Sequence, residues 1–94
     1  MREKSYKYSL DNDDLVIIET KKVHDSKYNG GIMFTFRCMS ADGALLFAIE
    51  NSHGQPHIHW RDRKENVNYD WRTALQKFDE MLNEHKRKID PRVD

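Results

Sequence analysis

The chain has 94 residues, which is the length of one small domain and leaves no room for a second. Charged residues make up 34% of the sequence and hydrophobic residues 37%, and the hydrophobic residues recur in periodic blocks, which argues against a disordered chain. Lysine plus arginine equals aspartate plus glutamate at 16 each, so no overall charge attracts the chain to nucleic acid or to an anionic membrane.

The first half of the sequence predicts four β-strands. Residues 5–10 alternate aromatic or aliphatic side chains with polar ones, which is typical of a half-buried strand, and an Asp/Asn-rich turn follows. Residues 15–24 begin with a β-branched aliphatic run, which predicts a second strand that ends before the Asn-Gly-Gly turn at residues 29–31. Residues 32–49 predict a β-hairpin around the turn Ser-Ala-Asp-Gly, with Phe34 and Phe36 on one face of its first strand and Thr35 and Arg37 on the other.

The second half predicts one more strand and one helix. Gly54 and Pro56 interrupt the chain, and alternation resumes at residues 57–61 as a short strand. Asp70 is a candidate N-cap for a helix over about residues 71–88, in which apolar side chains recur at helical spacing. We therefore expect residues 1–94 to form a single α+β domain, an antiparallel meander of about four to five strands with the C-terminal α-helix packed on one face.

The N-terminus and the cysteine content favour a cytoplasmic protein. The first four residues are polar, and no apolar stretch resembles a signal peptide or a membrane span, so we expect no membrane partner. Cys38 is the only cysteine, which rules out an internal disulfide, and the sequence has no CxxC or Cys/His zinc spacing.

The histidines are unusually concentrated. Three of the five, His53, His57 and His59, lie within seven residues, directly after Glu50 and Asn51. If the short strand continues beyond residue 61, the side chains on one of its faces include His57, His59, Arg61 and Arg63.

Acid–base catalysis on a phosphodiester is one interpretation of this segment. Imidazole titrates near neutral pH, so one histidine could take a proton from a ribose 2′-hydroxyl while another, or Glu50, handles the opposite proton. Arg61 and Arg63 would stabilise the charge on the phosphate, and Asn51 would help to orient the substrate. This interpretation predicts a ribonuclease that needs no metal and no cofactor.

Two other interpretations stay open. A divalent metal site would use His57 and His59, which point the same way on a strand, with His53 or Glu50 completing the set. Alternatively, the histidines decorate an exposed loop and an edge strand, and the chain is a non-enzymatic interaction module. Gly54 and Pro56 favour a functional loop, because they restrict its conformation.

Residues 46–59, followed by an amphipathic helix, resemble the TumE-like family of small prokaryotic toxin–antitoxin toxins. In that family a strand that ends in an acidic residue and Asn leads to a Gly/Pro-containing loop and closely spaced histidines. Glu50 and Asn51 occupy the corresponding positions in this sequence. The resemblance implies a toxin, a cognate antitoxin as partner, and RNA as the target. A homodimer is a further expectation, because a sheet this small has an exposed strand edge.

Overall fold

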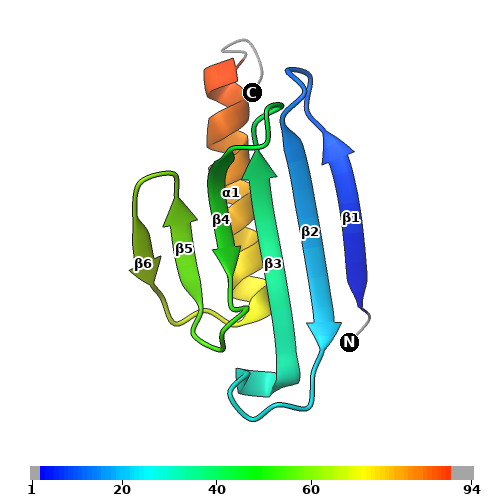
Figure 1. Cartoon of the computed structure of the whole chain (residues 1–94), viewed down its shortest axis with the longest axis vertical. Coiled ribbons are helices and arrows are strands. Elements are labelled where there is room, and N and C mark those ends of the chain that lie inside the picture. Colours follow the sequence, from blue (N-terminus) through cyan, green and yellow to red (C-terminus); the bar gives the residue numbers. More distant parts are fainter. Residues whose placement is uncertain (1–2, 90–94) are drawn as a thin grey trace.

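The computed structural model describes residues 3–89 as a six-stranded antiparallel sheet with one helix (Figure 1). The strands follow one another in the sheet in chain order, so the topology is a meander. This confirms the predicted α+β fold, with a sixth strand beyond the four to five expected. The elements are β1 (Lys4–Ser9), β2 (Leu15–Lys22), a 3₁₀ turn (Asn29–Gly31), β3 (Ile32–Met39), β4 (Leu45–Glu50), β5 (His57–Trp60), β6 (Lys64–Asn66) and α1 (Trp71–Ile89).

The turns form where the sequence supplies turn residues. In the β3–β4 hairpin the Ser40 amide donates to the Ala44 carbonyl at 2.8 Å, and Gly43 takes a φ of +92° that few other residues tolerate. The β1–β2 turn closes through Leu10 and uses Asp13 at a φ of +69°, a conformation that Asp adopts more readily than most residues. The last strand, β6, was not predicted, because it is short, polar and exposed and its sequence has no hydrophobic alternation.

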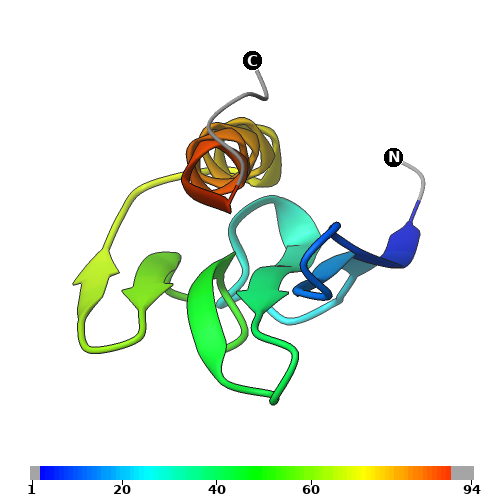
Figure 2. The same cartoon turned by 90° about the horizontal axis from the view of Figure 1, so that it is seen from above.

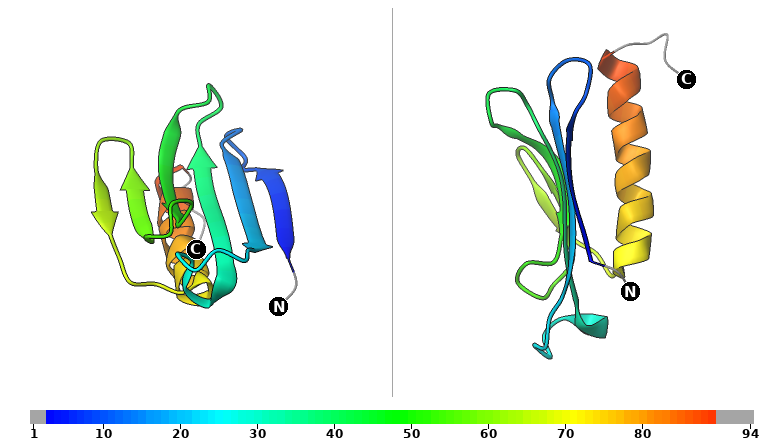
Figure 3. Two further views of the ribbon diagram at one scale, coloured as in Figure 1. Left: turned by 60° about the horizontal axis from the view of Figure 1, so that its bottom comes forward. Right: turned by 90° about the vertical axis from the view of Figure 1, so that its right-hand side faces the viewer.

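The two faces of the sheet differ because side chains alternate along each strand. One face packs against α1 and forms the core, and Figures 2 and 3 show the helix on that side alone. No element among residues 3–89 covers the other face, which we call the open face. The buried apolar side chains of the core are Val16, Phe34, Phe36, Cys38, Phe47, Ile49 and Ile58 from the strands and Ala74, Phe78 and Leu82 from the helix.

The helix begins and ends close to the predicted positions. The Asp70 carboxylate accepts a hydrogen bond from the Thr73 amide at 2.8 Å, which confirms the predicted N-cap and holds the pKa of Asp70 below its usual value. Lys86, Arg87 and Lys88 lie in the last turn, where cations are favoured by the helix dipole. Among the residues that the structure describes, no helix combines the length and apolar character needed to cross a membrane.

The first strand is more exposed than its alternating sequence predicts. Tyr6 is 56% exposed and Tyr8 is 42% exposed, although both belong to the helix-side face. The reason is that α1 packs over β3 and β4, in the middle of the sheet, and does not extend over β1 at its edge. The expectation of a half-buried first strand was therefore wrong.

Candidate functional site

The register of the strands aligns polar side chains across the open face. Antiparallel pairing places each β4 residue from Phe47 to Glu50 opposite one residue of β3 and one of β5, so the same face continues from strand to strand. Two rows of side chains run across the strands. Each row contains a histidine of β5 and a residue of β3 that is far from it in the sequence. The first row is Lys7, Ile17, Arg37, Ala48, His59 and Lys64, and the second is Ser5, Glu19, Thr35, Glu50, His57 and Asn66.

Four side chains meet in the middle of these rows, and we call them the open-face cluster: Arg37, Glu50, His57 and His59. Arg37 donates to Glu50 Oε2 from Nη2 at 2.9 Å and from Nε at 3.2 Å. His57 Nε2 lies 3.4 Å from the other carboxylate oxygen, Oε1. One ligand atom from each of Glu50, His57 and His59 lies within 4.8 Å of the other two, and the two imidazole rings meet edge to face.

Burial differs among the members of the cluster. The His57 side chain is only 4% exposed and that of Glu50 12%, whereas Arg37 is 42% exposed. His57 Nδ1 lies 3.2 Å from the Gln55 carbonyl oxygen, so each of its ring nitrogens faces an oxygen atom. His59 is partly exposed, so it and Arg37 are the members that a ligand reaches first.

The loop between β4 and β5 is fixed to the sheet by Asn51. This side chain is buried, accepts a hydrogen bond from the Phe34 amide at 2.7 Å and donates one to the Ile32 carbonyl at 2.9 Å. Both of its functional groups therefore satisfy backbone atoms at the start of β3. The structure shows Asn51 as a support for the loop, and the role in substrate binding that the sequence suggested stays a prediction.

Further contacts restrict the rest of this loop. The Tyr28 hydroxyl donates to the Ser52 carbonyl, and Gln55 Nε2 donates to the Val67 carbonyl at 3.0 Å. Gly54 has a φ of +94°, and a Cβ at this position would lie 2.9 Å from the Lys27 carbonyl oxygen, so the loop requires glycine here. Because the Gln55 carbonyl contacts His57, these contacts also set the position of the histidine ring.

The other predicted site residues lie outside the cluster. His53 is exposed in the β4–β5 loop and is not part of the group formed by Glu50, His57 and His59. The expectation that Arg61 and Arg63 share the histidine face was wrong, because β5 ends at Trp60 and the chain turns into β6. Arg61 is exposed in that turn, and the Arg63 guanidinium stacks on the Trp60 ring, 4.0 Å from its centroid.

Arg37 is the residue that sequence reasoning missed. It was assigned correctly to the polar face of its strand, and a charged side chain in the middle of a regular strand was the available signal. Its proximity to the histidines depends on the pairing of β3 with β4 and of β4 with β5. Lys64, which pairs with His59, was missed because β6 was missed.

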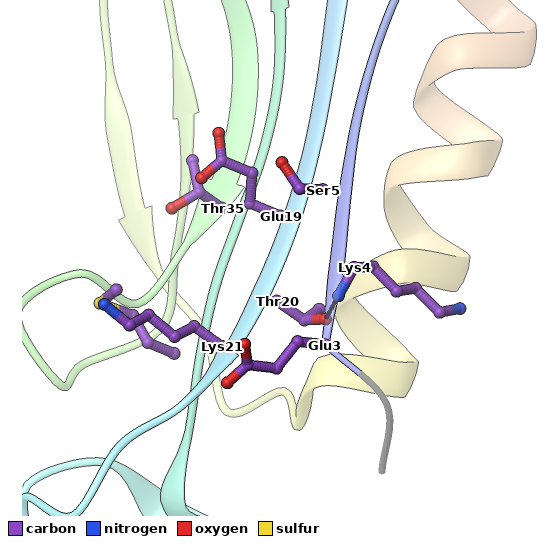
Figure 4. A pocket seen from close by; sticks show the side chains of 8 residues that line it. Glu3, Lys4, Ser5, Glu19, Thr20, Lys21 and Thr35 are labelled. Carbon is purple, nitrogen blue, oxygen red and sulfur yellow. Dashed lines mark hydrogen bonds between the residues drawn. The ribbon is translucent and has the colours of Figure 1, made fainter.

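A shallow pocket of about 240 Å³ continues the open face toward β1. Figure 4 shows Glu19 and Thr35 on this face of the sheet, with Lys4 directed to the helix side. Thr35 joins the pocket to the cluster, because it lines the pocket and pairs with Glu50. An extended ligand that reaches the cluster would therefore find a hollow beside it.

Comparison with protein-family models, curated proteins and solved structures finds no match to this chain. The resemblance to the TumE-like family therefore rests on residues 46–59 alone. The chemistry of the open face is therefore the main indication of a function.

Replacing Asn51 with alanine should lower the free energy of unfolding by about 1–3 kcal/mol, because the Phe34 amide and the Ile32 carbonyl lose their partner. Urea denaturation measures this change. The matched control is His53→Ala in the same loop, which should change stability by less than about 0.5 kcal/mol because His53 is exposed. Equal stability of Asn51→Ala and the wild type would contradict the supporting role of this residue.

Proposed function

We propose that this chain is a ribonuclease that cleaves RNA at the open-face cluster without a metal ion. The observation that carries the proposal is the placement of an arginine–glutamate pair beside two histidines on a sheet face that nothing in residues 3–89 covers. Acid–base groups next to a fixed cation are what the attack of a ribose 2′-hydroxyl on its own phosphate requires.

In this reaction the 2′-oxygen bonds to phosphorus and the bond from phosphorus to the 5′-oxygen breaks, which yields a 2′,3′-cyclic phosphate and a 5′-hydroxyl. A base takes the 2′-hydroxyl proton and an acid protonates the leaving oxygen. We assign Glu50 as the base and His59 as the acid, since Glu50 is a carboxylate with some exposure and His59 is the more accessible histidine. His57 is nearly buried against Glu50 and serves as a positioning residue for the carboxylate.

Arg37 is the group that we assign to the phosphate. Its Nε and Nη2 hold Glu50 Oε2, which leaves Nη1 for a phosphate oxygen at a side chain that is 42% exposed. Lys64 pairs with His59 on the neighbouring strand and adds a second cation on the same face. Cations at these positions stabilise the charge that develops on the phosphate in the transition state.

The biological role follows from the resemblance to TumE-like toxins. We propose that the protein is the toxin of a toxin–antitoxin pair, that it acts on RNA in the cytoplasm, and that a cognate antitoxin binds it. The edge strand β1, with its exposed Tyr6 and Tyr8, is the surface that best suits such a partner or a second copy of the chain.

The purified chain, free of any antitoxin, should cut an RNA oligonucleotide in EDTA and leave a 2′,3′-cyclic phosphate, as detected by chromatography and mass spectrometry. His59→Ala should slow cleavage by roughly 10²–10⁴-fold, the usual contribution of a general acid or base. The control variant His53→Ala should cut at the wild-type rate, because His53 lies outside the cluster.

Two outcomes would refute the ribonuclease. One is the absence of cleavage by folded wild-type protein over a panel of RNA sequences. The other is equal cleavage by His59→Ala and the wild type, which would place the activity elsewhere on the chain or in a contaminant. Circular dichroism of each variant separates loss of activity from loss of fold.

A non-enzymatic, metal-binding module is the second candidate function. The observation in its favour is that Glu50, His57 and His59 each offer a ligand atom within 4.8 Å of the others. Arg37 opposes it, because its guanidinium already occupies one oxygen of the Glu50 carboxylate.

If the open face binds a metal, calorimetry with zinc, nickel or manganese should give heat that the double variant His57→Ala/His59→Ala lacks. Arg37→Met should then tighten binding, since it frees the Glu50 carboxylate. Identical titrations for the wild type and the double variant with all three metals would eliminate this function.

A further inference from the structure

A second group of ligand-type side chains lies on the helix-side face of the sheet, apart from the open-face cluster. Asp14 comes from the β1–β2 turn, Cys38 from β3 and His85 from the last part of α1. One carboxylate oxygen, the thiol sulfur and one imidazole nitrogen all lie within 4.8 Å of one another. Three elements far apart in the chain thus deliver three potential metal ligands to one place.

We propose that Asp14, Cys38 and His85 bind a zinc-type divalent ion that fastens the end of α1 to the sheet. A thiolate, an imidazole and a carboxylate are all ligands that zinc accepts in tetrahedral sites, and a water molecule or a further side chain completes such a set. The thiolate favours a borderline-soft ion over magnesium or calcium, which prefer oxygen ligands. The spacing of these residues in the sequence matches no zinc motif, so only the fold brings them together.

The surroundings of the carboxylate leave it able to bind an ion. Asp14 is 6% exposed, and its Oδ2 accepts a hydrogen bond from Asn12 Nδ2 at 2.9 Å and lies 2.7 Å from His85 Nε2. Oδ2 is therefore the oxygen that faces His85, and an ion between the two residues would bind to it. The carboxylate is already compensated by its contact with His85, and a divalent ion bound between the two residues would supply the compensation as charge.

The thiol is the second indication. Cys38 is fully buried among the apolar side chains of the core, and it lies beside the Asp14 carboxylate. Zinc binds cysteine as the thiolate, so an ion bound here would displace the proton of the thiol.

The contact between His85 and Asp14 needs only a small adjustment to accept the ion. Two nitrogen or oxygen ligands on a tetrahedral zinc ion lie about 3.3 Å apart, so His85 Nε2 and Asp14 Oδ2 must separate by roughly 0.6 Å. The His85 side chain is 21% exposed and borders a surface pocket of about 340 Å³ together with Trp60 and Lys88. The imidazole therefore borders open space into which it can shift.

The test uses the full chain, stripped of metal with EDTA and then titrated with cobalt(II) as a spectroscopic substitute for zinc. The expected result is a thiolate-to-cobalt charge-transfer band together with the intense visible absorption of a tetrahedral cobalt site, both removed by zinc. Zinc addition should also release a proton from the thiol and raise the melting temperature. A folded wild-type chain that gives no thiolate band with cobalt would overturn the proposal.

Two variants locate the site, and a third serves as the control. Cys38→Ser and His85→Gln should each weaken zinc binding at least roughly tenfold, the scale seen when even an outer partner of a metal ligand is lost. The double variant His57→Ala/His59→Ala keeps all three ligands and should bind cobalt with the wild-type spectrum. An unchanged spectrum in folded Cys38→Ser would also overturn the proposal, whereas the outcome of the RNA assay does not affect it.

Discussion

The packing of α1 against the middle of the sheet decides which side chains this protein presents to solvent. Phe78 of the helix contacts Phe36 and Phe47, with ring centroids 6.0 and 5.5 Å apart, and these rings form the centre of the core. Residues 3–89 contain one α-helix, which covers one face of the sheet, and strand alternation sends every second residue to the other face. The open-face cluster exists because polar residues occupy those positions in β3, β4 and β5.

The second constraint is the attachment of the β4–β5 loop. Glu50 and His57 lie at the two ends of this loop and pair directly with each other across β4 and β5. Asn51 and Gly54 fix the loop against neighbouring backbone, so the carboxylate and the imidazole are held before any ligand arrives. Prior positioning of this kind lowers the cost of orienting catalytic groups during a reaction. The residues Gly54 and Pro56, which suggested a controlled loop, are part of that restraint.

Local sequence signals were sufficient for most of the fold. Period-two alternation gave the strands of the β3–β4 hairpin, and Asp70 with helical spacing gave α1, because both signals act over a few residues. The β6 strand lacks such a signal, since Lys-Glu-Asn neither alternates nor is buried. Its omission also explains why Arg61 and Arg63 were wrongly placed on the histidine face.

The site was less predictable because it depends on pairing between distant strands. A register shift between Cys38 and Met39 determines which residues of β3 lie opposite which residues of β4. In the resulting pairing Thr35 lies opposite Glu50, and Arg37 is close enough to Glu50 to contact it. A shift by one residue would place different side chains together, and the sequence alone does not fix it. The contact between Asp14 and His85 spans 71 positions and depends in the same way on helix docking.

The most direct test of the central claim is a nuclear magnetic resonance titration of the isotope-labelled chain with 2′-O-methyl RNA, which lacks the attacking hydroxyl and is not cut. We expect chemical-shift changes at Arg37, His57, His59 and Lys64 on the open face, and little change along α1. Changes confined to the helix side, or no change at RNA concentrations well above those of the cleavage assay, would contradict the assignment of the open face as the RNA-binding and catalytic surface.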